Sequence, residues 1–557
     1  MDYGKHYSTR TTPQSQAIPG SGQVENSAGG YSWQVDDWTS LDRFLILGTE
    51  GGSYYASEKD LTYKAGDATR RCIEQDGIRV VKRVVEISDA GRAPKNDPAI
   101  FVLAMCAGLG NDQTRKAAFK AIPAVCRIGT HLFTFMEYVE KFRGWGRGLR
   151  TAVGEWYTEK SVDDVAYQMV KYKQRGNWSH RDVLRLCHPV IHDVTHSDMP
   201  RMNSLFRWAV GKKTEVELPQ IVQAEQRMLE CNTTKDVIGV LNWCKQYPWE
   251  AIPTKHLKEP KIWEALLPRL PYTAMIRNLG RMTANGALTV NNFSEVTDKL
   301  TNQDGLKKAR IHPIQVLAAM MTYQSGQGMR GSLSWSPIRQ IVDALDEAFY
   351  LSFGNVEPTG KRLMLAIDVS GSMDCGWGYD GTVAGVPGLT PRIGAAAMAL
   401  ITQRVENHCH LVAFSDGNAK SPIGGLAGRA QYGSRYTPML DPITISSRQR
   451  LDDVVKMMQA MPFGGTDCAL PMLAAEAAGI DIDTFVIYTD SETWAGNIHP
   501  SQALKQYREK TGIPAKLVVV GMVANEFSIA DPRDAAMMDV IGFDTATPNI
   551  ISDFAKS

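Results

Sequence analysis

The spacing of apolar residues changes along the chain near residue 360. In residues 33–353, apolar positions recur three and four apart, as at Leu41, Phe44 and Leu45, in segments of about 12–18 residues. Glycine and proline residues interrupt these segments, and strand-like runs are almost absent. The pattern predicts an all-helical region of stacked helical hairpins in a solenoid, although no clean sequence period accompanies it.

After residue 360, short apolar runs rich in β-branched residues alternate with amphipathic stretches. The runs cover 363–369, 410–414, 484–488 and 515–522, and the helix-like stretches cover about 391–406, 448–460, 468–479 and 500–511. This alternation predicts an α/β domain with a doubly wound parallel sheet and helices on both faces.

The first 30 residues are rich in Ser, Thr, Gly, Pro and Gln, a composition typical of a mobile tail. We therefore expect three parts. A disordered tail would cover 1–30, a helical domain 31–360 and an α/β domain 361–557.

The overall composition is that of a globular protein, with 43% hydrophobic and 22% charged residues. Nine cysteines, an odd number without a Cys-x-x-Cys pair, argue against a disulfide framework or a zinc site. The chain has no run of about 18 apolar residues, and its polar N-terminus lacks the apolar centre of a signal peptide. We expect a soluble, cytoplasmic protein with no membrane partner.

Charge is distributed unevenly, although the formal net charge is only +1. Residues 361–557 hold 16 basic and 21 acidic side chains, whereas residues 1–360 hold 45 basic and 39 acidic ones. The window 111–190, with 14 basic and 8 acidic side chains, accounts for the whole positive excess of the first part. This window therefore predicts a local basic surface.

Three clusters carry this positive charge, at residues 115–131, 141–150 and 171–188. Residues three or four apart on a helix are neighbours, so we expect Lys116 and Lys120 on one face. For the same reason we expect Arg143, Arg147 and Arg150 on another. Such stripes suit phosphate contacts combined with base stacking. The aromatic residues near them are Trp145, Tyr172 and Trp178.

The alternative for any single stripe is a solvated helix face with core aromatic residues behind it. Three stripes inside one window of 80 residues, beside a neutral remainder, favour nucleic acid. The residues themselves do not separate RNA from DNA.

Polar residues follow the predicted strands at their carboxyl ends, where doubly wound sheets bind ligands. Asp368, Ser370 and Ser372 form an Asp-x-Ser-x-Ser motif after one strand, Asp490 follows another, and Thr466 lies in a Gly-Gly-Thr-Asp loop. The set resembles the metal-ion-dependent adhesion site of von Willebrand factor A domains. Its hard oxygen donors suit a divalent cation such as Mg²⁺. The three hydroxyls would bind directly, and the resemblance implies that the two aspartates act mostly through water.

Two alternatives to a metal site fit the same residues. Asp-x-Ser-x-Ser alone also describes an Asx-turn and helix cap at a strand end. A phosphoesterase that uses Asp368 as nucleophile is the second alternative. Such sites usually place a second carboxylate two residues on, where this chain has Ser370, and no His or Lys lies within the loop motifs. We therefore expect no enzymatic activity and no catalytic residue.

Longer motifs resemble the TROVE family of Ro autoantigens. The resemblance covers about residues 30–548 and includes both domains. The motifs lie at residues 30–35, 44–55, 126–135, 171–188, 276–283, 308–313, 356–369, 464–468, 513–516 and 529–532.

The resemblance implies a monomeric ring of HEAT-like helical repeats closed by a von Willebrand factor A domain. Family members bind Y RNAs on a basic outer surface and pass single-stranded 3′ ends of misfolded noncoding RNAs through the central hole, which suggests RNA quality control. In bacterial relatives a Y RNA tethers the ring to polynucleotide phosphorylase, a 3′ exoribonuclease. The residues that the family implies for Y RNA are Lys171, Arg175 and His188. Those implied for the basic surface and the hole are Lys116, Lys120, Arg127, His131 and Arg147.

Three segments depart from the animal members of the family. They are the polar tail before residue 30 and two insertion-like loops beside the metal edge, at 373–392 and 417–447. The leading interpretation is a non-enzymatic RNA-binding ring. The alternative is a metal-dependent protein-binding adaptor on a helical scaffold, with RNA binding incidental.

Overall fold

The structure is a computed structural model. It describes residues 11–48, 58–93, 95–190, 198–309, 311–328, 332–353, 358–373, 389–415, 440–442, 449–450, 453–454, 456–457, 465–523, 525–541 and 546–557. The second predicted insertion, 417–447, lies outside these ranges apart from residues 440–442, as does most of the first and most of the predicted helix 448–460. Among the described residues, no helix is both long and apolar enough to cross a membrane.

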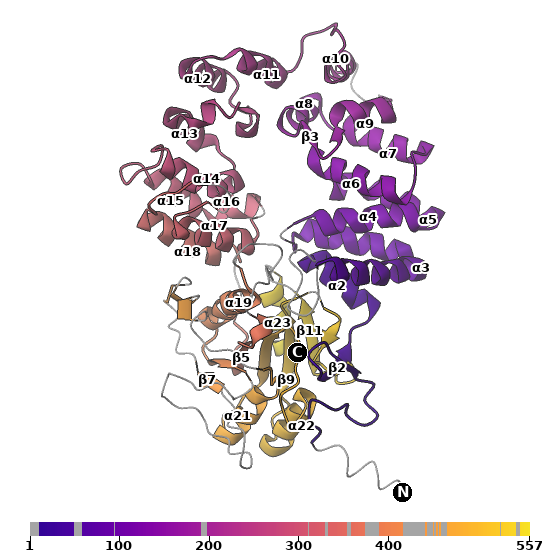
Figure 1. The fold of residues 1–557 in the computed structure, drawn as a ribbon, viewed down its shortest axis with the longest axis vertical. Helices are drawn as coiled ribbons and strands as arrows, with labels where there is room; N and C mark the ends of the chain where they lie inside the picture. Colours follow the sequence, from indigo (N-terminus) through magenta and orange to yellow (C-terminus); the bar gives the residue numbers. More distant parts are fainter. Residues whose placement is uncertain are drawn as a thin grey trace.

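The helical part forms two columns that rise from the sheet domain and meet at the far end of the molecule (Figure 1). The first column and the far end contain α2 (Asp37–Leu47), α3 (Glu58–Ala90), α4 (Asp97–Leu109), α5 (Asp112–Val125), α6 (Gly129–Phe142), α7 (Arg147–Thr158), α8 (Val162–Lys171), α9 (His180–Cys187) and α10 (Met199–Ala209). The path continues through α11 (Gln220–Glu230), α12 (Thr234–Trp243), α13 (Pro260–Leu266), α14 (Tyr272–Ala284), α15 (Ser294–Leu300), α16 (Gln303–Lys308), α17 (Pro313–Ser325) and α18 (Arg339–Leu351). The predicted all-helical ring module is confirmed.

Local sequence explains where these helices begin and end. Asp36 caps α2 by accepting the N–H of Thr39, and Ser179 and Asp182 form a reciprocal capping box at α9. Between α8 and α9 the chain forms a short hairpin, β3 (Gln174–Arg175) and β4 (Trp178–Ser179). Three 3₁₀ turns, Trp249–Ala251 (η1), His256–Lys258 (η2) and Leu267–Arg269 (η3), connect the helices of the second column.

The predicted doubly wound sheet is also confirmed. Its strand order is β11-β9-β8-β5-β6-β7, and every neighbouring pair is parallel except β6 and β7. The strands are β5 (Leu363–Asp368), β6 (Cys409–Phe414), β7 (Leu440–Pro442), β8 (Thr484–Thr489), β9 (Lys516–Gly521) and β11 (Met537–Ile541). The helices of this domain are α19 (Pro391–Val405), α21 (Leu470–Ala478), α22 (Pro500–Thr511) and α23 (Thr547–Lys556). Neither β11 nor α23 was predicted from the sequence.

The two faces of the sheet bury different cores, because side chains alternate along each strand. Leu365 and Ile367 of β5 join a core that also includes residues of α19 and α23 and continues into the helical columns. Met364 and Ala366 of the same strand join a separate core with α21 and α22. One sheet face is therefore packed toward the helical ring.

The prediction of a disordered tail over residues 1–30 is wrong for residues 11–30. Strand β2 (Tyr31–Gln34) pairs with β1 (Val24–Glu25) and with β10 (Phe527–Ser528), so this segment is part of the C-terminal domain's surface. Gln14 is fully buried, and its Nε2 donates to Asp467 Oδ1 at 2.6 Å and to the carbonyl of Ile498 at 2.8 Å. Polar residues suggested disorder because composition does not show which side chains find distant hydrogen-bond partners.

Side chains on both columns fasten the helices to the sheet domain. Buried Arg43 of α2 forms an ion pair with Asp539 of β11 at 2.6 Å and donates to the carbonyls of Asn525 and Phe527. On the other column, Arg450 pairs with Asp343 of α18, and the Arg404 guanidinium lies 3.2 Å from the centre of the Tyr350 ring. Both columns therefore contact the sheet domain, and together the helices and this domain form a closed ring.

Candidate functional site

Asp368 ends β5 and is fully buried at the carboxyl edge of the sheet. Its Oδ1 accepts the backbone N–H of Ser370 at 2.8 Å, and its Oδ2 accepts the hydroxyl of Thr489 at 2.7 Å. The hydroxyl oxygens of Ser370 and Ser372 lie 3.2 Å apart. Since β5 and β8 are adjacent, the Asp-x-Ser-x-Ser motif lies beside the strand that ends just before Asp490.

Backbone hydrogen bonds bring Thr466 to the same edge. Its carbonyl accepts the N–H groups of Trp494 and Ala495, each at 3.0 Å. The N–H of Cys468 donates to Thr493 Oγ1 at 3.1 Å. These bonds fasten the Gly-Thr-Asp loop to the loop that carries Asp490. The buried residues assembled at this edge are Asp368, Ser370, Ser372, Thr466 and Asp490, the full set predicted to bind metal.

Burial dominates the electrostatics of this edge. It raises the pKa of the Asp368 carboxyl to about 7, and the nearby charge of Asp490 adds to the rise. Burial also raises the pKa of Asp490. The pKa of Glu492, two residues further on, is raised to about 7 by burial and by Asp490. Buried carboxylates of like charge are unfavourable next to each other, and a bound cation would offset this cost.

The donor set at this edge fits a hard cation. Two carboxylates and three hydroxyls supply oxygen ligands of the kind that Mg²⁺ prefers. Within the part of the chain that the structure describes, no group of three or more His, Cys, Asp or Glu side chains is placed to hold a metal. A metal at this edge would therefore depend on the serine and threonine hydroxyls.

Two residues that support this edge were missed from the sequence. Thr489 donates to Asp368, and its position directly before Asp490 was the available signal. Arg392 is fully buried and donates from Nη2 to the carbonyl of Val369 at 2.8 Å, which holds the backbone of the Asp-x-Ser-x-Ser loop in place. No local sequence pattern marks Arg392 for this role.

The basic clusters lie on the first helical column, where α5, α7 and α9 form the outer layer and α4, α6 and α8 the inner one (Figure 1). Lys116 and Lys120 are both exposed on α5, as their spacing predicted. Arg147, the first residue of α7, is exposed as well. The α5 ring of Phe119 lies against Gly148, where an added Cβ would be 3.2 Å from it, so the two helices meet beside these cations. None of these three cations has an ion-pair partner among the described residues.

The predicted stripe of Arg143, Arg147 and Arg150 does not form. Arg143 lies after the end of α6 in an extended conformation, and α7 begins only at Arg147, because the glycines at 144 and 146 separate the two helices. Arg143 instead donates to the carbonyl of Ala107 at 3.1 Å. Burial, and secondarily the charge of Arg115, lowers its pKa.

The aromatic residues of these clusters belong partly to the core. Trp178 is only 8% exposed, and its ring lies 5.9 Å from that of Trp145. Trp178 is therefore a packing residue rather than a stacking platform for a base. Trp145 and Tyr172 remain partly exposed.

A second basic group lies at one end of the column, where α6 begins. The N–H of Gly129 donates to Gln168 of α8 at 2.9 Å, and the space beside Gly129 is filled by Tyr172 and His180. His131 lies near Arg127 and Arg175, which both lower its pKa, but burial is the larger cause and the pKa falls to about 4. His131 is therefore neutral at pH 7 and offers only a neutral hydrogen-bonding group.

The three residues linked to Y RNA by family resemblance occupy different settings. Lys171 is largely buried, with 13% of its side chain exposed, and its ammonium lies 3.6 Å from Glu250 and 3.2 Å from the Tyr167 hydroxyl. Burial acts to lower the pKa of Lys171, but the neighbouring Tyr172, Glu250 and Tyr167 outweigh it and the pKa is raised. Arg175 is exposed and pairs with Asp97 at 3.2 Å. His188 is exposed beyond the C-terminus of α9, in a left-handed conformation with φ of 46°. The eight residues of α9 separate it by about 12 Å from the hairpin that carries Arg175.

Comparison with known proteins matches both parts of the chain. The TROVE domain family matches residues 24–236 and 244–322, and the Ro60 vWA domain family matches residues 362–555. The "RNA-binding protein RO60" of Deinococcus radiodurans is 40% identical over 541 residues, covering 96% of this chain and 95% of that protein. That of Caenorhabditis elegans is 36% identical over 607 residues, covering 96% of this chain and 90% of that protein.

A solved structure agrees with this match. The crystal structure of the Deinococcus radiodurans Ro (RSR) protein aligns with a TM-score of 0.68 at 40% identity, over 94% of this chain and 99% of that one. The alignment covers the helical part and the sheet domain, in the same order along both chains. The chain therefore belongs to the Ro60 family, in which a TROVE domain is followed by a vWA domain.

Proposed function

We propose that this protein is a ring-shaped RNA-binding protein that acts in noncoding RNA quality control. The relatives named RNA-binding protein RO60 support RNA binding. The observation that carries the proposal is the outer layer of the first column, where Lys116, Lys120 and Arg147 are exposed on adjacent helices. Lysine and arginine side chains that have no ion-pair partner in the protein can bind the phosphates of an RNA duplex independently of its sequence.

Two kinds of RNA would use different parts of the ring. A Y RNA would bind the basic outer surface and the adjoining end of the column, through Lys171, Arg175 and His188. Single-stranded 3′ ends of misfolded noncoding RNAs would enter the central hole, with Arg127 and His131 near its rim. In a bacterial host, Y RNA would also connect the ring to a 3′ exoribonuclease such as polynucleotide phosphorylase.

The carboxyl edge of the sheet would serve as a binding site for Mg²⁺ and, through it, for an acidic group of a partner. Ser370, Ser372 and Thr466 would hold the cation directly, and Asp368 and Asp490 would hold its water ligands. The bound cation would supply a positive charge with an open coordination position. The protein itself would be a cytoplasmic monomer with no enzymatic activity.

The test is sequencing of RNA that copurifies with the full chain, beside a Lys171→Ala/Arg175→Ala/His188→Ala variant. A Lys235→Ala/Lys258→Ala variant is the matched control, because it removes two exposed cations from the second column. We expect a discrete small structured RNA with the natural protein and the control, and its loss in the test variant. For purified RNA, the slope of log K against log salt should flatten by about 1–2 in the test variant.

Two results would contradict the proposal. If the natural protein carries no RNA above background, RNA binding is not its function. Loss of a protein partner on chelation or in Ser370→Ala, with no copurifying RNA, would then support the metal-dependent adaptor instead. An unchanged salt slope in the test variant would exclude the Lys171 and Arg175 region as the RNA site.

A further inference from the structure

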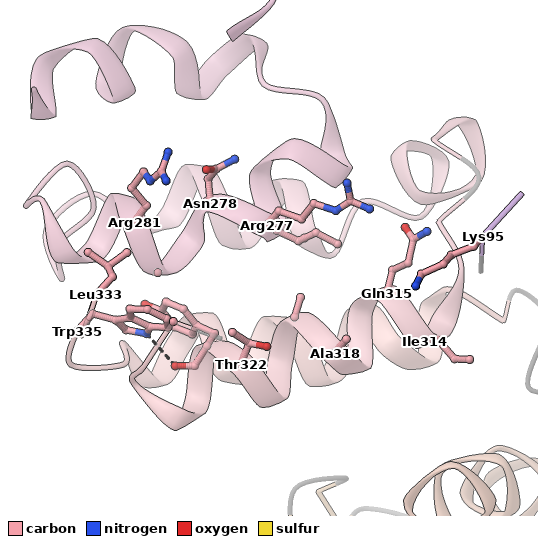
Figure 2. Close-up of a pocket in the computed structure, with 15 residues that line it drawn as sticks. Lys95, Arg277, Asn278, Arg281, Ile314, Gln315, Ala318, Thr322, Leu333 and Trp335 are labelled. Atoms are coloured by element: carbon pink, nitrogen blue, oxygen red, sulfur yellow. Dashed lines mark hydrogen bonds between the residues drawn. The ribbon is translucent and has the colours of Figure 1, made fainter. Parts of the chain in front are cut away.

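Some glycines of this chain lie where a larger residue would not fit. In the groove between α14 and α17, an added Cβ at Gly280 would lie 2.5 Å from the indole of Trp335, which closes one end of the groove (Figure 2). That contact joins neighbouring parts of the second column. At Gly30, an added Cβ would overlap the carbonyl oxygen of Thr493. This second contact joins the N-terminal segment, residues 11–34, to the loop after β8, more than 450 positions away.

The side-chain amide of Gln14 connects the two loops that carry proposed metal ligands. Its Nε2 donates to Asp467 Oδ1 at 2.6 Å and to the carbonyl of Ile498 at 2.8 Å, and its Oε1 accepts the hydroxyl of Thr493. Asp467 belongs to the Gly-Thr-Asp loop, whereas Thr493 and Ile498 belong to the loop after β8. Because Gln14 is fully buried, its loss would leave these partners without a replacement from water.

The N-terminal segment also holds the backbone just after Asp490. Nδ2 of buried Asn26 donates to the carbonyl of Thr493 at 2.9 Å, and the N–H of Ser27 donates to Glu492 Oε2 at 2.8 Å. Oδ1 of Asn26 accepts two backbone N–H groups of its own turn, at 2.9 and 3.1 Å. The turn therefore presents a fixed donor, which can hold the loop in one position.

Ser491, the residue after Asp490, has a backbone conformation that needs such support. Its φ is 63°, in the left-handed region that residues with a Cβ adopt rarely and at a cost in free energy. The Ser32 hydroxyl donates to the Ser491 carbonyl at 3.2 Å, and the Ser491 N–H donates to Thr489 Oγ1 at 3.1 Å. Such a conformation persists only where surrounding contacts hold it. One of these two contacts comes from the N-terminal segment.

We propose that the N-terminal segment sets the affinity of the carboxyl edge of the sheet for Mg²⁺, with Gln14 as a positioning residue. The segment would act through the two loops, because Gln14 keeps Thr466 and Asp490 in fixed relative positions. Docking of the segment and Mg²⁺ binding would then be linked, so that each strengthens the other by the same factor. The inference rests on the proposed function only for the presence of a Mg²⁺ site at this edge.

The first experiment measures Mg²⁺ affinity by calorimetry on the full chain. Gln14→Ala should weaken binding by about tenfold, the lower end of the range for residues that orient metal ligands. Gly30→Ala should also weaken it, because the added methyl group overlaps Thr493 and lifts the segment from the loop. Gln16→Ala, at an exposed position in the same segment, should keep the natural affinity.

A second control separates positioning from a general loss of stability. The hydroxyl of Tyr507 on α22 donates to the Ile480 carbonyl at 2.8 Å and accepts the N–H of Ile482 at 2.6 Å. These bonds precede β8 and lie at the amino edge of the sheet, opposite the proposed metal site. Tyr507→Phe should therefore lower thermal stability but keep Mg²⁺ affinity within about twofold. Equal loss of Mg²⁺ affinity in Tyr507→Phe and Gln14→Ala would overturn a positioning role for Gln14.

The reciprocal effect is measured by hydrogen exchange. In the natural protein, saturating Mg²⁺ should slow the exchange of peptides from residues 11–34 by at least about tenfold, as the linkage requires. The slowing should be absent in Ser370→Ala, which removes a proposed ligand and keeps the hydrogen bonds of the segment. A segment that merely packs on the domain would exchange at one rate with and without Mg²⁺, which would overturn the inference.

The outcomes separate this inference from the proposed function. Mg²⁺ binding that is lost in Ser370→Ala, but unchanged in Gln14→Ala and Gly30→Ala, overturns the role of the segment and retains the metal site. Absence of Mg²⁺ binding by the natural protein overturns both this inference and the proposed metal site. The proposed RNA-binding function stands in either case, because copurifying RNA is measured independently.

Discussion

At the scale of single residues, burial decides whether a titratable side chain carries a charge at neutral pH. His131 and His180 show this most clearly, because burial lowers the pKa of each to about 4. His180 is held as a neutral ring: Tyr157 Oη lies 2.8 Å from Nδ1, and the Gln168 carbonyl lies 3.3 Å from Nε2. Lys116, Lys120 and Arg147 keep their charge exposed to solvent. Fewer charged side chains are therefore exposed on the first column than its number of basic residues suggests.

The buried His180 predicts a loss of stability in acid. Its pKa in the folded state is below that of an unfolded chain, so the unfolded state binds more protons as pH falls from about 6.5 to 4. This histidine should lower the free energy of unfolding by up to about 1.4 kcal/mol per pH unit in that range. Chemical denaturation at pH 7 and pH 5 should show a smaller difference in His180→Gln. Tyr157→Phe, which keeps the imidazole, should retain the natural difference.

The proposed metal site at the carboxyl edge of the sheet predicts that Mg²⁺ affinity depends on the hydroxyl of Ser370. Ser370→Ala removes a proposed direct ligand and should weaken Mg²⁺ binding by about tenfold or more, measured by calorimetry on the full chain. Ser336→Ala, at an exposed position in the helical part, should leave Mg²⁺ binding unchanged. Undiminished binding in Ser370→Ala would remove this motif from consideration as the metal site.

At the scale of elements, long-range contacts give the N-terminal segment its structure. Residues 12–34 contact loops more than 450 positions away, through Thr12 to Gln502, Gln14 to Asp467 and Asn26 to Thr493. The N–H of Ser27 also donates to Glu492 at 2.8 Å. The segment thus covers the loop that follows β8 and carries Asp490. It belongs physically to the sheet domain although it precedes the helices in sequence.

Gln14 provides the test at this scale. Gln14→Ala removes hydrogen bonds to Asp467, Ile498 and Thr493 and leaves buried polar groups unsatisfied, so we expect a loss of about 1–3 kcal/mol in stability. Gln16→Ala is the matched control, because that side chain is exposed. Thermal unfolding of both variants, with hydrogen exchange of residues 490–496, would show the difference. Equal stability of the two variants would mean that the segment does not support the domain.

At the scale of the whole molecule, the ring depends on a few strong contacts at its closure. On one side Arg43 is buried against Asn525, Phe527 and Asp539. On the other side the contacts of Arg450 and Arg404 with α18 are more exposed.

Y RNA and a 3′-tailed RNA are predicted to compete. The duplex part of a tailed RNA would need the same basic outer surface as Y RNA, so saturating Y RNA should reduce binding of a tailed duplex by about tenfold. Competition binding at constant salt would measure this. Unchanged binding of the tailed duplex would show that the two RNAs use separate surfaces.

Much of the architecture follows from local sequence. The apolar period of three to four residues marked the helices up to residue 353, and the runs at 363–369 and 484–488 marked β5 and β8. These patterns are local, because a helix or a buried strand must present apolar side chains at regular intervals. The order of strand ends also sufficed to bring together Asp368 and Asp490, because parallel strands end at one edge. Thr466 lies in a loop before α21, and its place at this edge followed from the resemblance to the metal-ion-dependent adhesion site.

Only the tertiary structure decided which polar residues are buried and which distant segments meet. Composition could not show that Gln14 would be buried against Asp467, that Arg392 would hold the loop after β5, or that Trp335 would rest on Gly280. It also could not show that Arg143 lies outside α7 or that His131 is neutral. Hydrophobic periodicity depends on neighbours in sequence, whereas desolvation, charge pairing and close packing depend on neighbours in space.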